Sequence, residues 1–170
     1  GISRTILFNE SIVVDYLSSF MKIITLISAF VVLLISSNYL KTFKIFKIEY
    51  PILILSSVLG MMIMISSNDL IVFYMGLELQ SLALYVLATF NRDQLKSSEA
   101  GLKYFVLSAL SSGLLLYGCS LIYGFTGSTN FNFISTQFNT SEYALTFGIV
   151  FVLVGLAFKI SAVPFHMWAP

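Results

Sequence analysis

Five long apolar stretches constrain the fold of this sequence more than any other feature. Crossing a hydrocarbon layer of about 30 Å takes about 20 helical residues, and each stretch is close to that length. The composition agrees: 58% of the residues are hydrophobic and 10% are charged, whereas soluble domains carry about 25% charged residues. The chain is therefore predicted to be an integral membrane protein. The predicted spans are residues 20–40, 51–67, 70–90, 102–125 and 143–163.

The spans are predicted to be α-helices, giving an all-α membrane fold. A membrane β-barrel needs repeated segments of about ten residues that alternate between apolar and polar side chains. Runs such as FVVLLI at residues 30–35 do not alternate. Only Asn68 and Asp69 separate the second and third spans, so these helices are predicted to form an antiparallel hairpin. No internal repeat or linker divides residues 1–170, and one membrane domain is expected.

The polar segments predict how the chain lies in the membrane. Residues 1–19 carry apolar side chains at helical spacing among polar ones, which predicts an amphipathic helix in the interface. The turn at 68–69 and the segment 126–142 contain no lysine or arginine. By the positive-inside rule, the loops after the first and third spans face the cytoplasm or the mitochondrial matrix. These loops carry Lys41, Lys44, Lys47, Arg92 and Lys96.

Charge and composition exclude several classes of function. A net charge of +1 provides no basic surface for nucleic acid. One cysteine and one histidine cannot form a disulfide, a cysteine-ligated cluster or a bis-histidine haem site. The sequence also lacks a phosphate-binding loop and a nucleophile paired with a base. No cofactor is expected in this chain, and any redox centre should lie on another subunit.

Glu78 lies in the interior of the third predicted span. Eight residues of helix place it roughly 12 Å below the surface, too deep for a short side chain to reach the headgroups. Because an intramembrane charge costs at least about 2.5 kcal/mol, the side chain should face protein or water. It is either a proton-transfer group or a protonated carboxyl that makes a helix–helix hydrogen bond. Ser81 and Tyr85 follow on the same helix face.

Lys159 lies deep in the fifth predicted span, five residues before Pro164. Proline tends to break a helix, and broken helices within membranes line cavities that bind ions or substrates. The last helix is therefore predicted to be discontinuous near Pro164. Lys159 should either exchange protons in such a cavity or extend from the inner helix end to the headgroups.

Lys103 and His166 are weaker candidates for proton transfer. Lys103 follows Glu99 by four residues at the start of the fourth span, which predicts an ion pair at a helix end. His166 can relay protons near neutral pH or make a hydrogen bond at the interface, where it lies between Pro164 and Trp168.

The fourth span also carries small residues. Cys119 is expected to be a packing residue. Three serines and Gly113 form a face suited to close helix packing, with a serine-lined water path as the alternative. The serines are Ser108, Ser111 and Ser112.

Three motifs, taken together, resemble subunit 2 (subunit N in bacteria) of respiratory complex I, the proton-pumping NADH:quinone oxidoreductase. They are MGLELQSLALY at 75–85, EAGLKYF at 99–105 and FKISAVPFHMWAP at 158–170. The resemblance extends from about Asp15 to the last residue. The forms ELxSLxxY and KxSAVPFHxW are more similar to subunit 2 than to subunits 4 and 5 or to the related cation/proton antiporters.

The resemblance implies an antiporter-like proton channel. In this family the glutamate matched by Glu78 pairs with the lysine matched by Lys159 on a discontinuous helix, and the lysine matched by Lys103 lies on the helix between them. His166 carries over only as a candidate relay. Full-length members contain two inverted repeats, and this chain corresponds to most of the first repeat. It is expected to be either a split-gene product or part of a longer polypeptide.

The resemblance also implies partners and a location. Flavin, iron–sulfur clusters and quinone are expected on other complex I subunits, and the partners are those membrane subunits, any chains that complete this one, and the lipid bilayer. Two alternatives remain: a subunit of a multi-subunit cation/proton antiporter, and a structural membrane subunit that conducts nothing. The residue usage is typical of an AT-rich genome, which favours the mitochondrial inner membrane, with the bacterial plasma membrane as the alternative.

Overall fold

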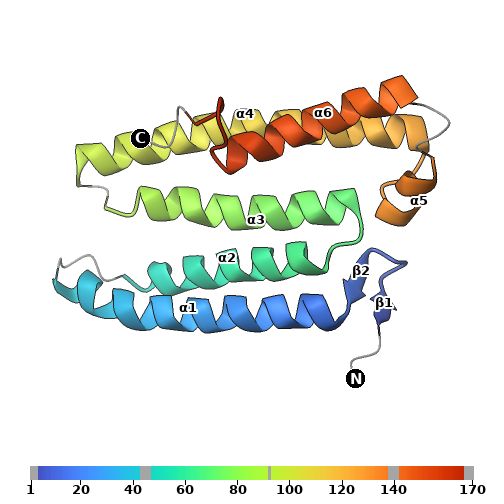
Figure 1. Cartoon of the computed structure of the whole chain (residues 1–170). Helices are drawn as coiled ribbons and strands as arrows, with labels where there is room; N and C mark the ends of the chain where they lie inside the picture. Colours follow the sequence, from blue (N-terminus) through green and yellow to red (C-terminus); the bar gives the residue numbers. More distant parts are fainter. Residues whose placement is uncertain (1–3, 43–46, 92, 138–141, 167–170) are drawn as a thin grey trace.

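The structure is a bundle of long helices that lie side by side (Figure 1). It is a computed structural model that describes residues 4–42, 47–91, 93–137 and 142–166. Helices α1, α2 and α3 follow one another across the bundle, and α4 packs with α6 beyond α3. The elements are β1 Thr5–Leu7, β2 Ile12–Val14, α1 Tyr16–Thr42, α2 Glu49–Ser66, α3 Leu70–Ala88, α4 Leu95–Thr126, α5 Phe131–Thr136 and α6 Glu142–Lys159.

Within the described residues, four helices, α1 to α4, are long and apolar enough to cross a membrane, and they correspond to the first four predicted spans. Helix α4 begins at Leu95, earlier than the predicted residue 102, because the polar segment before the apolar run is also helical. Helix α6 contributes a shorter apolar segment, Leu145–Lys159, and ends before the predicted residue 163. The predicted all-α membrane fold is confirmed.

The two ends of the bundle differ in charge, as the loops predict. The α1–α2 and α3–α4 connections lie at one end, which we call the lysine end (Figure 1). Lys41, Lys47 and Lys96 belong to this end, whereas Lys44 and Arg92 lie outside the described residues. The β-hairpin, the α2–α3 turn and the α4–α5 connection lie at the opposite end.

The α2–α3 turn is held by its own polar side chains. The Asp69 carboxylate accepts hydrogen bonds from the backbone N–H groups of Ile71 at 2.8 Å and Val72 at 3.3 Å, and so caps α3. Thr129, in the α4–α5 connection, donates its hydroxyl proton to the same carboxylate, and its carbonyl accepts from the Leu70 N–H at 2.9 Å. The helix hairpin is thereby tied to the connection that follows α4.

The N-terminal segment differs from the predicted interfacial helix over residues 1–19: the prediction is wrong for residues 5–14, whereas residues 16–19 form the start of α1. Residues 5–14 form an antiparallel hairpin in which Thr5 pairs with Val14. Its turn, residues 8–10, has positive φ angles, which reverse the chain and are incompatible with a right-handed helix. The β-branched side chains of both strands favour extended backbone, and this preference outweighs the helical spacing of the apolar residues.

The hairpin is attached to the helices at the end of α2. The backbone N–H of Asn68 donates to the Ser11 carbonyl at 2.8 Å, and its side-chain amide donates to the Glu10 carbonyl at 2.9 Å. Asp15 caps α1: its carboxylate accepts from the Ser18 N–H at 2.7 Å, and the Ser18 hydroxyl accepts from the Asp15 N–H at 2.9 Å. The backbone hydrogen bond from Ser18 is the largest cause that lowers the pKa of the Asp15 carboxyl.

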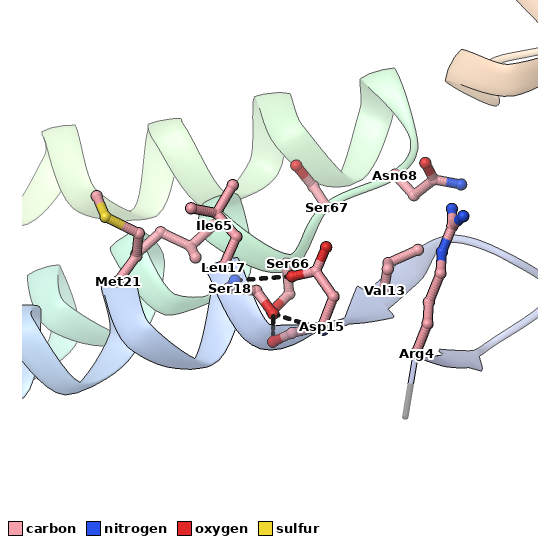
Figure 2. Close-up of a pocket in the computed structure, with 10 residues that line it drawn as sticks. All are labelled: Arg4, Val13, Asp15, Leu17, Ser18, Met21, Ile65, Ser66, Ser67 and Asn68. Carbon is pink, nitrogen blue, oxygen red and sulfur yellow. Dashed lines mark hydrogen bonds between the residues drawn. The ribbon is translucent and has the colours of Figure 1, made fainter. Parts of the chain in front are cut away.

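A pocket of about 370 Å³ lies between the hairpin, the start of α1 and the end of α2 (Figure 2). Figure 2 shows Arg4 and Asn68 at one side of it and Asp15 with Ser18 at the other. None of the four predicted site residues lines this pocket, which lies at the end of the bundle opposite the lysine end.

Glycines set the spacing of two helix pairs. A methyl group on Gly60 of α2 would lie 2.6 Å from the backbone nitrogen of Gln80 and 2.7 Å from the carbonyl oxygen of Gly76, both on α3. A methyl group on Gly118 of α4 would lie 2.8 Å from the carbonyl oxygen of Gly148 on α6. Lipid tails are as apolar as the side chains, so the hydrophobic effect does not drive helices together within a membrane. Close van der Waals contact between backbones supplies much of the attraction instead.

We predict that Gly60→Ala and Gly118→Ala each lower the free energy of unfolding by about 1 to 3 kcal/mol, because the added methyl group meets backbone that cannot rotate away. Thermal unfolding in detergent or lipid measures this. Gly124→Ala is the control: beyond the neighbouring backbone of its own helix, no described atom lies within 4 Å of its added methyl group, and alanine is the better helix former. Equal stability losses at all three positions would contradict the packing argument.

Candidate functional site

A charged pair lies inside the bundle, where α3 faces α6. The Lys159 Nζ is 2.6 Å from Glu78 Oε1. The side chains are 9% and 19% exposed, respectively. Glu78 lies in the middle of α3, and Lys159 is the last residue of α6. Glu78 and Lys159 are the two charged residues predicted to lie deepest in the membrane spans, and the structure brings them into contact.

Two serine hydroxyls complete the polar contacts of this pair. Ser112 of α4 donates to the same Glu78 oxygen at 2.5 Å. Its hydroxyl also lies 3.0 Å from the Ser108 carbonyl, so a single proton has two acceptors available. Ser81 accepts from the Lys159 ammonium at 3.3 Å and donates to the Leu77 carbonyl at 2.7 Å. Three helices therefore contribute to the site, and α4 does so through a serine.

The position of Lys159 depends on how α6 ends. The Ser161 N–H donates to the Phe158 carbonyl at 3.2 Å, and the Ala162 N–H donates to the Ala157 carbonyl at 2.9 Å. Ser161 has a φ of 55°. This is a Schellman motif, which satisfies the last carbonyls of a helix and turns the chain away. The helix therefore stops beside the middle of α3, before the proline that the sequence analysis expected to break it (Figure 1).

A cavity of about 320 Å³ lies next to the pair. It is formed by residues of α2, α3, α4 and the end of α6. Most of its wall is apolar, but polar groups are also present: Gln80, Ser81, Tyr104, Ser108 and Lys159. A space of this size with several polar partners is large enough to hold water.

Lys103 is not part of the charged pair. Its ammonium contacts Glu99 at 2.7 Å, one turn earlier on α4, and the two side chains are 60% and 55% exposed. The structure therefore shows the helix-end ion pair that the spacing predicts, and it does not bring Lys103 into contact with Glu78.

His166 and Cys119 also lie apart from the pair. The His166 side chain is exposed beyond the end of α6, and no hydrogen bond or ion pair joins it to another described residue. Cys119 is buried in the apolar core between α3, α4 and α6, where it packs with Leu115, Ile122 and Leu145.

The serines of α4 do more than the close packing predicted from the sequence. Ser111 and Ser112 are buried, as a packing face requires, but Ser112 also makes a direct contact with Glu78. The signal available in the sequence was its i+4 spacing from Ser108 on an apolar helix, which places a hydroxyl every turn on one face. That pattern alone does not show which neighbouring helix the face meets.

The arrangement can hold and release a proton. A lysine next to a carboxylate keeps its proton more firmly than a lysine alone in an apolar setting. Separation of Lys159 from Glu78 would leave each group without its charged partner. The serine hydroxyls offer hydrogen bonds to either one in the separated state. The nearby cavity supplies room for the ammonium group to move.

Residues 67–170, more than half of the chain, match the family described as "NADH:quinone oxidoreductase/Mrp antiporter, TM". Subunit N of the NADH-quinone oxidoreductase of Pelagibacter ubique is 79% identical over 164 residues, which make up 96% of this chain and 35% of that protein. The chain spans about a third of the length of the curated relatives it matches.

Solved structures show the same fold. A chain of respiratory complex I from Thermus thermophilus with bound aureothin superposes with a TM-score of 0.76 at 30% identity, over 98% of this chain and 35% of that one. A chain of the Mrp complex from Dietzia sp. superposes with a TM-score of 0.63 at 31% identity, over 70% of this chain and 23% of that one. The resemblance carried by the three sequence motifs is confirmed, and the chain belongs to the NADH:quinone oxidoreductase/Mrp antiporter membrane family.

Proposed function

We propose that this chain forms part of an antiporter-like subunit of complex I and carries protons through one half-channel. Its contribution is coupled to NADH oxidation and quinone reduction on other subunits, so the enzyme activity is that of a proton-translocating NADH:ubiquinone reductase as a whole. The observation that carries the proposal is the buried Glu78–Lys159 pair at the end of a helix that stops inside the bundle. The relatives named as subunit N support the assignment to complex I.

The pair acts by alternating between contact and separation. In contact, Lys159 is charged and shares Glu78 Oε1 with the Ser112 hydroxyl. In separation, Glu78 keeps the Ser112 hydrogen bond, and Lys159 keeps its contact with Ser81 on the cavity side. Each state offers the charged groups polar partners, which limits the cost of burying a charge. A change in the surrounding field can then favour uptake or release of one proton.

The proposal extends to partners, cofactors and location. The partners are other membrane subunits of complex I, together with any chains that complete this subunit if its gene is split. Flavin, iron–sulfur clusters and quinone belong to those other subunits, and this chain holds no cofactor. The chain is a multi-pass membrane protein. Because its relatives are bacterial, the bacterial plasma membrane replaces the mitochondrial inner membrane as the proposed location, with the lysine end in the cytoplasm.

A multi-subunit cation/proton antiporter is the second candidate, since the Mrp complex of Dietzia has a chain of similar fold. The two candidates differ in redox chemistry. We expect the purified native assembly to show flavin absorbance and iron–sulfur electron paramagnetic resonance signals that NADH reduces. An intact assembly that transports protons and contains neither signal would instead support the antiporter.

We predict that Glu78→Gln and Lys159→Met, made separately in the assembled complex, each lower NADH-driven proton pumping by at least about 10-fold, because either change leaves the partner charge buried and unpaired. A pH-sensitive dye in proteoliposomes measures pumping, and NADH oxidation is measured in parallel. Glu49→Gln and Lys96→Met repeat the same chemical changes on exposed residues at the lysine end and should leave pumping unchanged. Normal pumping in both site variants would instead favour a structural subunit.

Lys103 gives a second test of the geometry. Its ion pair with Glu99 is exposed, and exposed i,i+4 pairs contribute only about 0.3 to 0.5 kcal/mol. If Lys103 acts only in that pair, Lys103→Met and Glu99→Gln should have equally small effects on assembly and pumping. A loss of pumping in Lys103→Met comparable to that in Lys159→Met, with Glu99→Gln normal, would show that Lys103 takes part in the channel as the family resemblance implies.

A further inference from the structure

The hydroxyl group of Tyr85 has no role in the site as described so far. Tyr85 lies on α3, seven residues after Glu78, and is only 5% exposed. Its hydroxyl oxygen is buried and makes no hydrogen bond with any described residue. A buried polar group without a partner costs about 1 to 3 kcal/mol, so a phenylalanine would serve packing better at this position. The hydroxyl group therefore calls for a functional explanation.

The surroundings of Tyr85 connect it to Lys159. Its ring is held edge-on by Tyr104 at 4.7 Å and Phe105 at 5.7 Å between ring centroids, both on α4. The hydroxyls of Ser81 and Ser108 lie close to the phenol oxygen without completing a hydrogen bond. Ser81 is also the residue that accepts from the Lys159 ammonium. The Ser81 hydroxyl therefore lies between the Tyr85 phenol and the charged pair.

The same residues border the cavity beside Lys159. Ser81, Tyr104 and Ser108, which surround the phenol, all line it. Its volume of about 320 Å³ leaves room for water. Tyr85 lies near the end of α3, so this polar edge of the cavity is on the side of Lys159 that faces the lysine end.

We propose that Tyr85 is a positioning residue for proton transfer to Lys159: its hydroxyl orders water and the hydroxyls of Ser81 and Ser108 on the cavity side of the lysine. Ser81 provides the connection. Its oxygen accepts from Lys159, its proton is given to the Leu77 carbonyl, and a lone pair remains for a donor such as the Tyr85 phenol or a water that the phenol holds. When Lys159 has lost its proton, the Ser81 hydroxyl turns from the Leu77 carbonyl and gives its proton to the neutral amine. Ser81 takes a replacement proton from the Tyr85 phenol or the water beside it, and that group is reprotonated from the lysine end.

This inference rests on the proposed function. Tyr85→Phe in the assembled complex removes one oxygen and keeps the ring between Tyr104 and Phe105. We expect proton pumping to slow by about 3- to 10-fold, the range that one hydrogen bond accounts for. We also expect a larger solvent deuterium isotope effect on pumping, because proton delivery becomes rate-limiting. Tyr117→Phe is the control, since that ring packs on Phe151 and is half exposed; it should match the unmodified complex.

If the Tyr85 hydroxyl has no part in proton transfer, we expect the opposite result. Removing a buried, unpartnered hydroxyl should then leave Tyr85→Phe equally or more stable, with normal pumping and a normal isotope effect, and this outcome would overturn the inference. If Tyr85→Phe does not assemble, Ser108→Ala tests the same chain of hydroxyls; slower pumping with the larger isotope effect supports the inference, and normal pumping refutes it.

The proposed function is tested separately by Glu78→Gln and Lys159→Met in the same assay. Loss of pumping in those variants together with normal Tyr85→Phe refutes only the role of Tyr85. Normal pumping in all of the variants refutes both proposals.

Discussion

The bilayer offers no water to an ionised side chain, and this constraint determines how α3, α4 and α6 must meet. Glu78 and Lys159 are largely buried inside the bundle, so each needs a partner from another helix. Their contact fixes the end of α6 against the middle of α3, and Ser112 brings α4 to the same carboxylate oxygen. Pairs of this kind contribute little net stability, because desolvation offsets attraction. The Glu78–Lys159 pair is therefore not the main source of the bundle's stability.

The stability of the bundle comes from close backbone contact instead. Gly60 against Gly76 and Gly118 against Gly148 let two helix pairs approach to a distance that any side chain would prevent. The first pair is α2 with α3 and the second is α4 with α6, so each pair joins apolar helices that follow one another in the bundle. Helix α3 then joins the two pairs through its contacts with α4. The charged pair lies at this junction, where two tightly packed units meet through looser contacts and a cavity.

The helices and the deepest charges could be predicted from the sequence, because both depend on local pattern and on the cost of placing polar atoms in lipid. The hairpin at residues 5–14 could not be predicted in this way. Apolar residues there fit helical spacing, but the turn at residues 8–10 and β-branched neighbours stabilise a hairpin that is fastened to Asn68, which is distant in the sequence. Ser112 was likewise recognised as a small buried residue, while its contact with Glu78 depends on how α3 and α4 pack, which local pattern does not determine.

The early end of α6 has an electrostatic consequence. The peptide dipoles of a helix add up to a partial negative charge at its C-terminus, equivalent to roughly half an elementary charge. Lys159 occupies the last turn, where the field of this partial charge is strongest. The lysine is therefore stabilised by two sources of negative potential, and only one of them, Glu78, is a side chain that can move away. A helix that crossed the whole membrane would have placed its C-terminus in the headgroups, where water screens it. By stopping inside the bundle, α6 supplies a fixed counter-charge that remains when the carboxylate withdraws.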